Sequence, residues 1–257
     1  MEKNVSVDNN FLNSSNNSAK DSIISKNMNP ALTREEIKIS IKRTIKGYYF
    51  FKRSFDVFFS FLFIIILSPL FLLTTIIMLC SFTYPIIFKD KRIGKNGKIF
   101  NVYKFRTMYN DAEKNIEKYL NKEQIKIWED ERKLVNDPRV SKIGKILRKT
   151  SIDELPQLFN IFIGNMSFIG NRPIIERELN VNYYEFERNI LLTSKPGLSG
   201  YWQVYGRENA NYKNGKRQEL ELEYYKHRSL SFDLLLVFKT IPAVFKHHET
   251  DCKKIKH

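Results

Sequence analysis

The sequence predicts a mostly helical α+β protein that attaches to one face of a membrane, and three observations carry this prediction. Residues 57–88 form a run of 32 residues without a charge, which Ser68-Pro69 interrupts. A hairpin signal, Asn96-Gly97, follows soon after that run. Most of the remaining chain has apolar residues at helical spacing among many charges. We therefore expect a monotopic membrane protein with a proline-broken re-entrant helix, interfacial amphipathic helices and a small β-hairpin.

The composition indicates an anionic partner. Lys and Arg total 43 against 28 Asp and Glu, which gives a net charge of +15 over 257 residues. An excess of this size favours nucleic acid, acidic lipid or a phosphorylated substrate. The two cysteines form neither a disulfide framework nor a zinc spacing, which suits a reducing, cytosol-facing protein. The pair His247-His248 lacks further ligands at fixed spacing, so a solvated tail is favoured over a metal site.

Four regions divide the chain. The first thirty residues contain eight Asn and six Ser without the apolar stretch of a secretory signal, so residues 1–36 are expected to be a disordered polar tail. Residues 37–88 are expected to form a membrane-entry segment and a re-entrant helical hairpin. Residues 89–246 follow as a cytosolic and interfacial domain, and 247–257 as a second tail.

The uncharged run exceeds the about 20 apolar residues that a transmembrane helix needs. Because proline removes a backbone hydrogen bond and clashes with the preceding turn, Ser68-Pro69 should break the helix. The limb 57–68 would then be about 18 Å long, too short for a hydrocarbon core of about 30 Å. Both flanks are basic, which leaves no charge difference to orient a crossing. These flanking residues are Lys42, Arg43, Lys46, Lys52, Arg53, Lys89, Lys91, Arg92, Lys95 and Lys98. A hairpin that returns to the same face is favoured, and a kinked spanning helix is the alternative.

The dipeptide Asn96-Gly97 is a strong signal for a two-residue hairpin turn between the β-prone segments 92–93 and 99–105. The nearby glycines fail the spacing of a phosphate-binding loop, so the turn is favoured. Lys104 and Arg106 should point to the same face of the second strand. Such a pair can hold a phosphate, although a solvated charged face is equally common.

Two helical stretches are predicted between the hairpin and the centre of the chain. Residues 110–134 read as one charged helix that Asp137-Pro138 ends, and we find no chemistry there. The next stretch has an apolar stripe surrounded by basic residues, and it could lie on an anionic membrane surface. The stripe consists of Val140, Ile143, Ile146 and Leu147.

Two adjacent carboxylates, Asp153 and Glu154, follow this basic helix. Taken alone, Ser151-x-x-Glu154 predicts only a helix capping box, with Pro156 favoured at the first helical position. The positive end of that helix should help to keep Asp153 ionised. Adjacent carboxylates can also hold Mg²⁺ together with substrate phosphates, and a carboxylate can attack a phosphoryl group. We expect the cap and the site to coexist.

The C-terminal part begins with a turn at 195–200. Trp202 is expected to be a core or membrane-interface aromatic residue. Gln203 and Arg207 are weaker candidates for contacting a sugar or a phosphate. A charged helix is predicted at 219–228. The apolar segment 230–245 contains Pro242, which should interrupt it, and it should lie in the membrane interface.

Several long motifs occur in one order along the chain. They are KRSFD (52–56), Ser68-Pro69, RIGKNGKIF (92–100), KFRTM (104–108), NDPRVSKIGKILRKTSIDELPQLFNIFIGNMSFIGNRP (136–173), KPGLSGYWQVYGR (195–207) and SLSFDLLLVFKT (229–240). In these motifs the chain resembles the bacterial sugar transferases, the monotopic phosphoglycosyl transferases that begin lipid-linked polysaccharide assembly. Its segment 110–136 is similar to that of the longer members that transfer hexose 1-phosphates. We expect their additional N-terminal transmembrane bundle to be absent here.

The resemblance implies an enzyme of the bacterial inner membrane whose catalytic domain lies on the cytoplasmic face. It implies that a UDP-sugar gives its hexose 1-phosphate to Asp153 and releases UMP. A polyprenyl phosphate, undecaprenyl phosphate in particular, then takes the phosphosugar. It further implies that Asp153 and Glu154 hold Mg²⁺, and that Arg148, Arg172 and Pro173 contact the anion and the nucleotide. Anionic membrane lipid is an expected partner and nucleic acid is not, while a homo-oligomer stays open.

Two departures from the family pattern lie near the site. Ile152 replaces the usual Leu before the carboxylates, which is a mild change of shape. Asn171 stands where the usual Gly-Pro-Arg-Pro motif has its first proline, which is expected to loosen a rigid turn beside Arg172. The identity of the sugar stays open among galactose, glucose and an acetamido sugar. Two other functions are weighed against the enzyme: a non-catalytic membrane scaffold of the same fold and a membrane-tethered nucleic-acid-binding protein. The abutting carboxylates disfavour the scaffold, and the absence of a recognised nucleic-acid motif disfavours the second.

Overall fold

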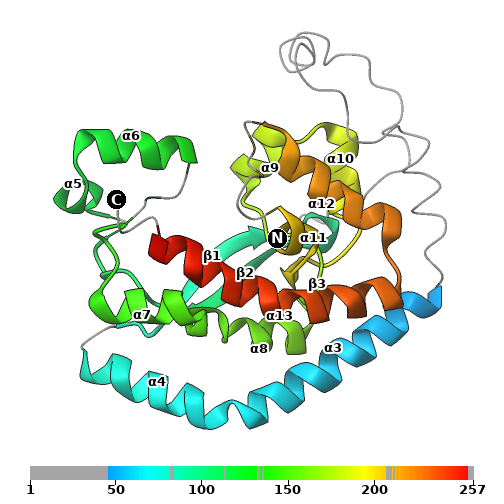
Figure 1. Ribbon diagram of the computed structural model, residues 1–257, viewed down its shortest axis with the longest axis horizontal. Coiled ribbons are helices and arrows are strands. Elements are labelled where there is room, and N and C mark those ends of the chain that lie inside the picture. Colours follow the sequence, from blue (N-terminus) through cyan, green and yellow to red (C-terminus); the bar gives the residue numbers. More distant parts are fainter. Residues whose placement is uncertain are drawn as a thin grey trace, which may run out of the picture.

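The computed structural model describes residues 46–81, 84–112, 114–131, 134, 136–206, 210, 212 and 214–253. The predicted N-terminal tail, 1–36, and the candidate Arg207 lie outside the described residues. Within that part of the chain the protein is mostly helical, with two small two-stranded sheets (Figure 1). The α+β class predicted from the sequence is therefore confirmed.

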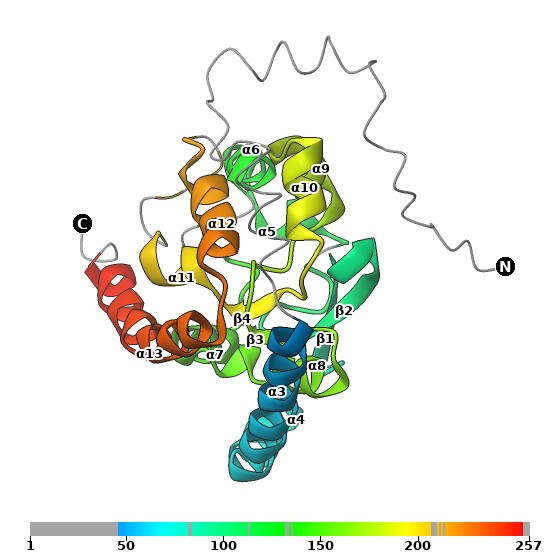
Figure 2. The same ribbon diagram turned by 90° about the vertical axis from the view of Figure 1, so that its right-hand side faces the viewer.

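Two helices, α3 (Lys46–Ile66) and α4 (Ser68–Cys80), contain most of the uncharged run. They are bent by 58° at the break, and Pro69 lies in the first turn of α4, where its missing N–H costs no helical hydrogen bond. Figures 1 and 2 show both helices along one side of the molecule, below the other elements. No single helix among the described residues is long and apolar enough to cross a membrane. The two helices of this bent pair together have the length and apolar composition for it. The break lies where Ser68-Pro69 predicted it.

A β-hairpin follows, in which β1 (Ile87–Ile93) pairs antiparallel with β2 (Ile99–Phe105). Asn96 and Gly97 adopt φ values of 57° and 74° at its tip, the left-handed conformation that this turn requires. The predicted turn is therefore confirmed. The first strand is longer than predicted, because it begins at Ile87 and includes the last two residues of the uncharged run.

The predicted single helix over 110–134 is wrong. The chain instead forms a one-turn helix, α5 (Ile116–Tyr119), and a separate helix, α6 (Lys122–Glu131). Asn121 separates them: its Oδ1 accepts a hydrogen bond from the Gln124 backbone N–H (2.8 Å), and Gln124 Oε1 accepts one from the Asn121 N–H (3.1 Å). This reciprocal capping starts a new helix.

The segment at the centre of the fold packs against the two helices near the bend between α3 and α4. Helix α7 (Lys142–Thr150) leads into a 3₁₀ turn, η2 (Ile152–Glu154), and then into α8 (Gln157–Ile163). Helix α8 packs against α3, and Leu158 and Ile161 are buried with Val102 of β2. This packing fixes the η2 turn between the hairpin and the α3–α4 pair (Figure 1).

The second half of the chain forms the larger core. Strands β3 (Ser167–Ile169) and β4 (Gly197–Ser199) pair in parallel, so the segment expected to be only a turn also contains a strand. The helices of this half are α9 (Glu176–Asn182), α10 (Glu185–Leu191), α11 (Tyr201–Tyr205), α12 (Lys216–His227) and α13 (Leu230–Lys253). The predicted interruption at Pro242 is wrong, because α13 continues through it into the predicted second tail.

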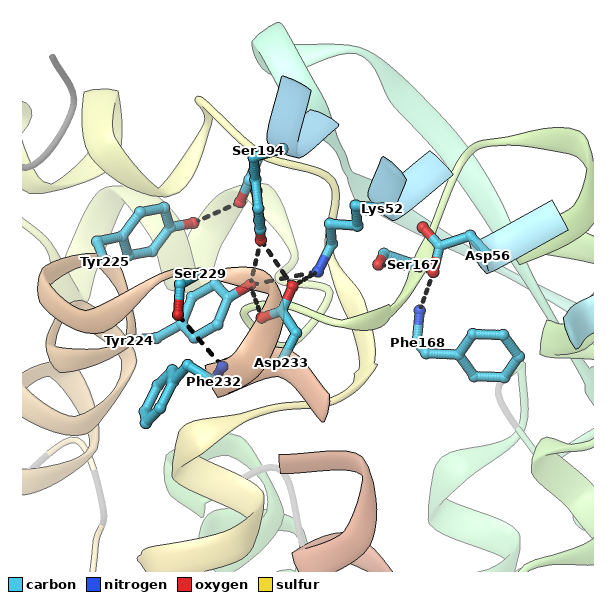
Figure 3. A network of polar contacts seen from close by, with 11 residues as sticks. Lys52, Asp56, Ser167, Phe168, Ser194, Tyr224, Tyr225, Ser229, Phe232 and Asp233 are labelled. Atoms are coloured by element: carbon cyan, nitrogen blue, oxygen red, sulfur yellow. Dashed lines mark hydrogen bonds and ion pairs between the residues drawn. The ribbon is translucent and has the colours of Figure 1, made fainter. Parts of the chain in front are cut away.

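Polar contacts fix α3 to the rest of the protein (Figure 3). Lys52 forms an ion pair with Asp233 of α13, whose Oδ2 and Oδ1 also accept hydrogen bonds from the Tyr48 and Tyr224 hydroxyls (2.7 Å each). Asp56 accepts a hydrogen bond from the Phe168 backbone N–H (3.1 Å). Because all of these groups are buried or half-buried, the first turns of α3 are held firmly against α13 and β3.

Candidate active site

The two carboxylates stand on the η2 turn between α7 and α8. Ser151, in the left-handed conformation (φ 56°, ψ 16°), ends α7, and its backbone carbonyl accepts a hydrogen bond from the Glu154 N–H (3.2 Å). Its side chain makes no capping hydrogen bond to the next helix. The expected Ser151-x-x-Glu154 capping box is therefore wrong, because Ser151 joins the end of α7 to the start of η2 through its backbone and not through its side chain. The left-handed residue turns the chain so that Asp153 and Glu154 form a separate corner.

Close packing positions α7 and therefore this corner. A Cβ on Gly144 would lie 2.0 Å from the Thr107 carbonyl oxygen, so only glycine allows α7 to approach the end of β2. Ser141 caps α7 by accepting a hydrogen bond from the Gly144 N–H (2.9 Å). Leu147 is buried against Phe105 and Met78. The predicted basic helix is thus present, with its last turn fixed beside the carboxylates.

Lys104 and Arg148 bring positive charge to the corner. Lys104 Nζ lies 3.1 Å from Glu154 Oε1. Arg148 donates from Nε to Thr107 Oγ1 (2.9 Å), and its charge acts on Asp153. The structure therefore brings these two predicted residues together with the carboxylate pair.

The Asp153 carboxyl is harder to ionise than a free aspartate. Its pKa is raised to about 6, chiefly by burial and then by the neighbouring Glu154, while Lys104 and Arg148 act in the opposite direction. With a pKa of about 6 the group is still mostly ionised at neutral pH. The contribution of the helix end to this ionisation stays a prediction. A carboxylate that is ionised at neutral pH but poorly solvated is a reactive nucleophile.

Arg172 is a third cation whose charge interacts with Glu154. It reaches solvent, yet the surrounding protein desolvates its guanidinium. This desolvation and the nearby Arg217 lower its pKa, while Glu154 opposes them. Hydrogen bonds anchor the backbone on both sides of Arg172. They are Gly170 N to Ser199 O (2.9 Å), Gly197 N to Asn171 O (2.8 Å), Arg92 Nη1 to Pro173 O (3.3 Å) and Ile93 N to Ile174 O (2.9 Å).

Asn171 fixes the same turn through its side chain. It is 9% exposed, its Oδ1 accepts a hydrogen bond from the Tyr225 hydroxyl (2.9 Å), and its Nδ2 donates to the Arg172 carbonyl (3.3 Å). The loosening expected from the missing proline is therefore not observed, because hydrogen bonds hold the turn instead.

A family model described as bacterial sugar transferase matches residues 47–247. The chain belongs to the bacterial sugar transferase family. The resemblance drawn from its motifs is confirmed, and this bacterial sugar transferase is an enzyme.

Curated relatives support the assignment. The exopolysaccharide production protein ExoY of Sinorhizobium fredii is 44% identical over 195 residues, which cover 75% of this chain and 84% of the relative. The undecaprenyl-phosphate galactose phosphotransferase of Salmonella typhimurium is 39% identical over 207 residues, covering 77% of this chain and 41% of the relative. The UDP-glucose:undecaprenyl-phosphate glucose-1-phosphate transferase of Escherichia coli is 33% identical over 199 residues, covering 74% and 39%. The sugar transferase thus spans most of ExoY and about two-fifths of the longer relatives.

The other predicted substrate-binding residues that the structure describes, Arg106, Pro173 and Gln203, lie beside different partners. Arg106 donates from Nε to the Pro85 carbonyl (2.8 Å) and lies over the Phe88 ring, so it does not form the predicted pair with Lys104. Strand β2 ends at Phe105, and the two-residue alternation ends with it. The Pro173 carbonyl is held by Arg92, and Gln203 Oε1 lies beside Gly200.

Arg217 is a cation near the site that sequence reasoning missed. Its guanidinium lies 4.4 Å from the Trp202 ring centre and 4.1 Å from that of Tyr212, and its Nε is 3.3 Å from the buried Glu221 Oε1. The helix predicted at 219–228 begins earlier, at Lys216, so Arg217 fell outside it. The four-residue spacing between Arg217 and Glu221 was the available signal.

Proposed function

We propose that this sugar transferase moves a hexose 1-phosphate from a UDP-sugar to undecaprenyl phosphate through a covalent phosphosugar on Asp153, and releases UMP. One observation carries the proposal: the partly desolvated Asp153 carboxylate lies beside Glu154 within a group of cations that Lys104, Arg148 and Arg172 provide. The relatives named for undecaprenyl phosphate and for UDP-sugars supply the substrate classes. Relatives are named for galactose, glucose and N-acetylgalactosamine, so the sugar remains open.

The first step is a displacement at phosphorus. An Asp153 carboxylate oxygen attacks the phosphorus that bears the sugar, and the bond from that phosphorus to the bridging oxygen breaks. UMP leaves with the electron pair. Arg172 and Arg148 would neutralise the diphosphate, which an ionised aspartate would otherwise repel. Lys104 would hold Glu154 away from the attacking oxygen.

The second step regenerates the enzyme. An oxygen of the polyprenyl phosphate attacks the same phosphorus, and the bond to Asp153 breaks to restore the carboxylate. The product is a polyprenyl diphosphate sugar. The atoms balance without an added oxidant or reductant, because each step exchanges one oxygen–phosphorus bond for another.

Mg²⁺ fits the carboxylate pair as a proposed cofactor. No group of three or more His, Cys, Asp and Glu side chains that could hold a metal occurs among the described residues. Mg²⁺ needs no such group, because it commonly uses one or two carboxylates together with substrate phosphates. Repulsion between the Asp153 and Glu154 carboxylates contributes to the raised pKa of Asp153. A divalent cation bound between them would reduce this repulsion. Bound Mg²⁺ would neutralise charge on the diphosphate while Asp153 and Glu154 hold it.

We further propose that α3 and α4 enter the cytoplasmic face of the inner membrane and return to it, with α7 and α13 lying in the interface. The basic flanks, the uncharged run and the bend of 58° support this placement. Many of their apolar side chains are exposed; those on α3 include Phe58, Phe61 and Ile65. Cysteines placed near Lys46 and Lys98 should both be labelled only from the cytoplasmic side of intact cells. Opposite accessibility would show a spanning helix instead.

A membrane-fraction assay tests the activity. Undecaprenyl phosphate is supplied with a panel of UDP-sugars, and UMP release and labelled lipid are measured. One sugar of the panel should give both products. Asp153→Asn should abolish transfer and any covalent adduct, whereas Asp111→Asn, which changes a carboxylate outside the pair, should not. Near-normal transfer by Asp153→Asn would remove the nucleophile assignment. A scaffold or a nucleic-acid-binding protein would release no UMP with any sugar.

A further inference from the structure

An apolar groove runs along one side of α3, away from the carboxylate pair. Its volume is about 440 Å³, and Phe162 of α8 forms its far wall. The remaining lining residues come from successive turns of α3. They are Phe50, Arg53, Ser54, Val57, Phe58 and Phe61. Phe58 and Phe61 are 62% and 53% exposed, and Phe61 stacks with Phe162 at 5.9 Å between ring centres.

Three cations gather at one end of this groove. Arg53 donates from Nη1 and Nη2 to the carbonyls of Ile161 and Phe162 (2.7 Å each), which fixes it at the end of α8. A side chain on Gly164 would come within 3.1 Å of Arg53 Nη2 and 3.3 Å of Lys195 Nζ, so both cations converge on this glycine. Lys95 adds a third charge that acts on Lys195.

One carboxylate, Asp56, opposes this positive charge at Lys195. Asp56 already accepts hydrogen bonds from Ser167 Oγ and the Phe168 N–H (3.1 Å each). Burial, and then the charge of Arg53, lower the pKa of Lys195. The cluster therefore has an excess of positive charge that an external anion would neutralise.

The order of residues along α3 matches the profile of a membrane surface. Arg53 and Asp56 are the last charged residues before the uncharged run begins at Val57. Phe61 lies two turns beyond Arg53, or about 12 Å further along the helix. If the first turns of α3 lie at headgroup depth, as the proposed membrane placement requires, then the groove lies at the depth of acyl chains.

We propose that this groove binds one anionic phospholipid, whose phosphate contacts Arg53 and Lys195 and whose acyl chain lies along Val57, Phe58 and Phe61. The occupant is a resident lipid and not the phosphate acceptor of the reaction. Helix α8 separates the two places, because Phe162 and Gly164 lie at its C-terminal end and Asp153 precedes its N-terminal end. Its seven residues alone span about 10 Å, so a phosphate held at Arg53 cannot attack a phosphosugar on Asp153.

Lipid retention by the full chain tests the site. The protein is extracted in mild detergent, incubated with phosphatidylglycerol or phosphatidylcholine, and examined by native mass spectrometry without nucleotide sugar. The wild type should retain one phosphatidylglycerol in preference to phosphatidylcholine. Lys195→Gln should reduce this preference about fivefold, the effect of one basic residue near an anionic lipid. Lys195→Arg should restore it, and Lys89→Gln, an exposed lysine on β1, should match the wild type.

Further measurements distinguish lipid binding in this groove from loss of folding and from binding of the acceptor. Phe58→Ser should weaken retention of both lipids, because it removes apolar wall and not charge, and a thermal unfolding scan of each variant controls for folding. Equal preference in wild type and Lys195→Gln would overturn the proposal. Displacement of phosphatidylglycerol by an equimolar polyprenyl phosphate would assign the groove to the acceptor instead. Asp153→Asn should retain the lipid normally, so failure of the catalytic proposal would leave this result unaffected.

Discussion

The Lys104 ammonium lies 3.1 Å from Glu154 Oε1, across 50 residues of sequence. The hairpin strand β2 thus directly contacts the turn that carries Asp153 and Glu154. Both side chains are partly exposed (27% and 42%), and ion pairs of this kind contribute about 0–1 kcal/mol to stability. The contact therefore serves to orient Glu154 and to reduce the charge around Asp153.

Removing this contact should reduce turnover with little effect on folding. Lys104→Met should lower kcat at least about tenfold, which corresponds to about 1.4 kcal/mol of lost transition-state stabilisation. Its melting temperature should stay close to that of the wild type. Lys104→Arg should recover part of the activity because it keeps the charge. Lys118→Met, which breaks an exposed ion pair with Asp111, is the matched control. An unchanged kcat in Lys104→Met would remove Lys104 from the mechanism.

Activity should fall in mild acid. Because the pKa of Asp153 is raised to about 6, the nucleophile becomes protonated as the pH drops through 6, and kcat/KM should decline with a midpoint near that value. Glu154→Gln removes a negative neighbour, so the acid limb of its residual activity should move to lower pH. A profile that stays flat from pH 7 to 5 would contradict the assignment of Asp153.

The raised pKa of Asp153 also predicts that its ionised carboxylate destabilises the folded protein. A folded-state pKa above the ordinary 3.8 means that the charged carboxyl is disfavoured by folding, so this cost is present above pH 6 and disappears as the pH falls towards 3.8. The rise to about 6 corresponds to at most roughly 3 kcal/mol at neutral pH. Asp153→Asn should therefore unfold at a higher temperature than the wild type at pH 7.5 and lose most of this advantage at pH 4.5. A lower melting temperature at pH 7.5 would contradict the desolvation argument.

The features predicted correctly from the sequence depend on neighbouring residues. The turn at Asn96-Gly97 and the break at Ser68-Pro69 each follow from a few adjacent positions. The capping box predicted at Ser151–Glu154 is replaced by the η2 turn. The pairing of β3 with β4 was missed because each strand has only three residues and about thirty residues separate them. Three residues are too few to show an alternating pattern.

Side-chain roles within the site were harder to predict because distant segments decide them. Lys104 and Arg106 look equivalent in the sequence, yet only Lys104 reaches Glu154, because Arg106 follows the end of β2 and is held by the Pro85 carbonyl. The missing proline at Asn171 predicted a looser turn, because the residue that holds Asn171, Tyr225, lies 54 residues later in the sequence. Arg217 was missed because its helix was predicted to begin only at 219, and because the rings that it faces, Trp202 and Tyr212, lie outside that helix.

Asn171 should control the affinity for the nucleotide sugar through Arg172. Asn171→Ala removes both side-chain hydrogen bonds, and the apparent KM should rise roughly fivefold per bond of about 1 kcal/mol, with kcat changed less. Tyr225→Phe should shift KM in the same direction. Asn182→Ala removes only a local bond to the Glu178 carbonyl and should leave KM unchanged. A fall in melting temperature with an unchanged KM would mean that Asn171 has a structural role alone.

The buried pair Asp137–Arg139 should support the site from the segment that leads into α7. Arg139 donates from Nε (2.9 Å) and Nη2 (2.6 Å) to the two oxygens of Asp137, and both side chains are at most 6% exposed. Burial alone would raise the pKa of Asp137, but the hydrogen bonds from Arg139 outweigh it and hold the pKa below its usual range. Stability from this pair is thus present at neutral pH and is lost as the pH falls through that lowered pKa.

Breaking the pair leaves one buried charge without its partner, which costs about 3–5 kcal/mol. Asp137→Ala should therefore lower the melting temperature strongly at pH 7, and the difference from the wild type should shrink at acid pH, where Asp137 is protonated. Asp111→Ala breaks an exposed pair and should lower the melting temperature far less. The Arg139 carbonyl accepts a hydrogen bond from the Tyr109 N–H (3.0 Å), so the loss should spread to the chain entering α7 and reduce kcat as well. Equal melting temperatures for Asp137→Ala and Asp111→Ala would show that burial does not make this pair important.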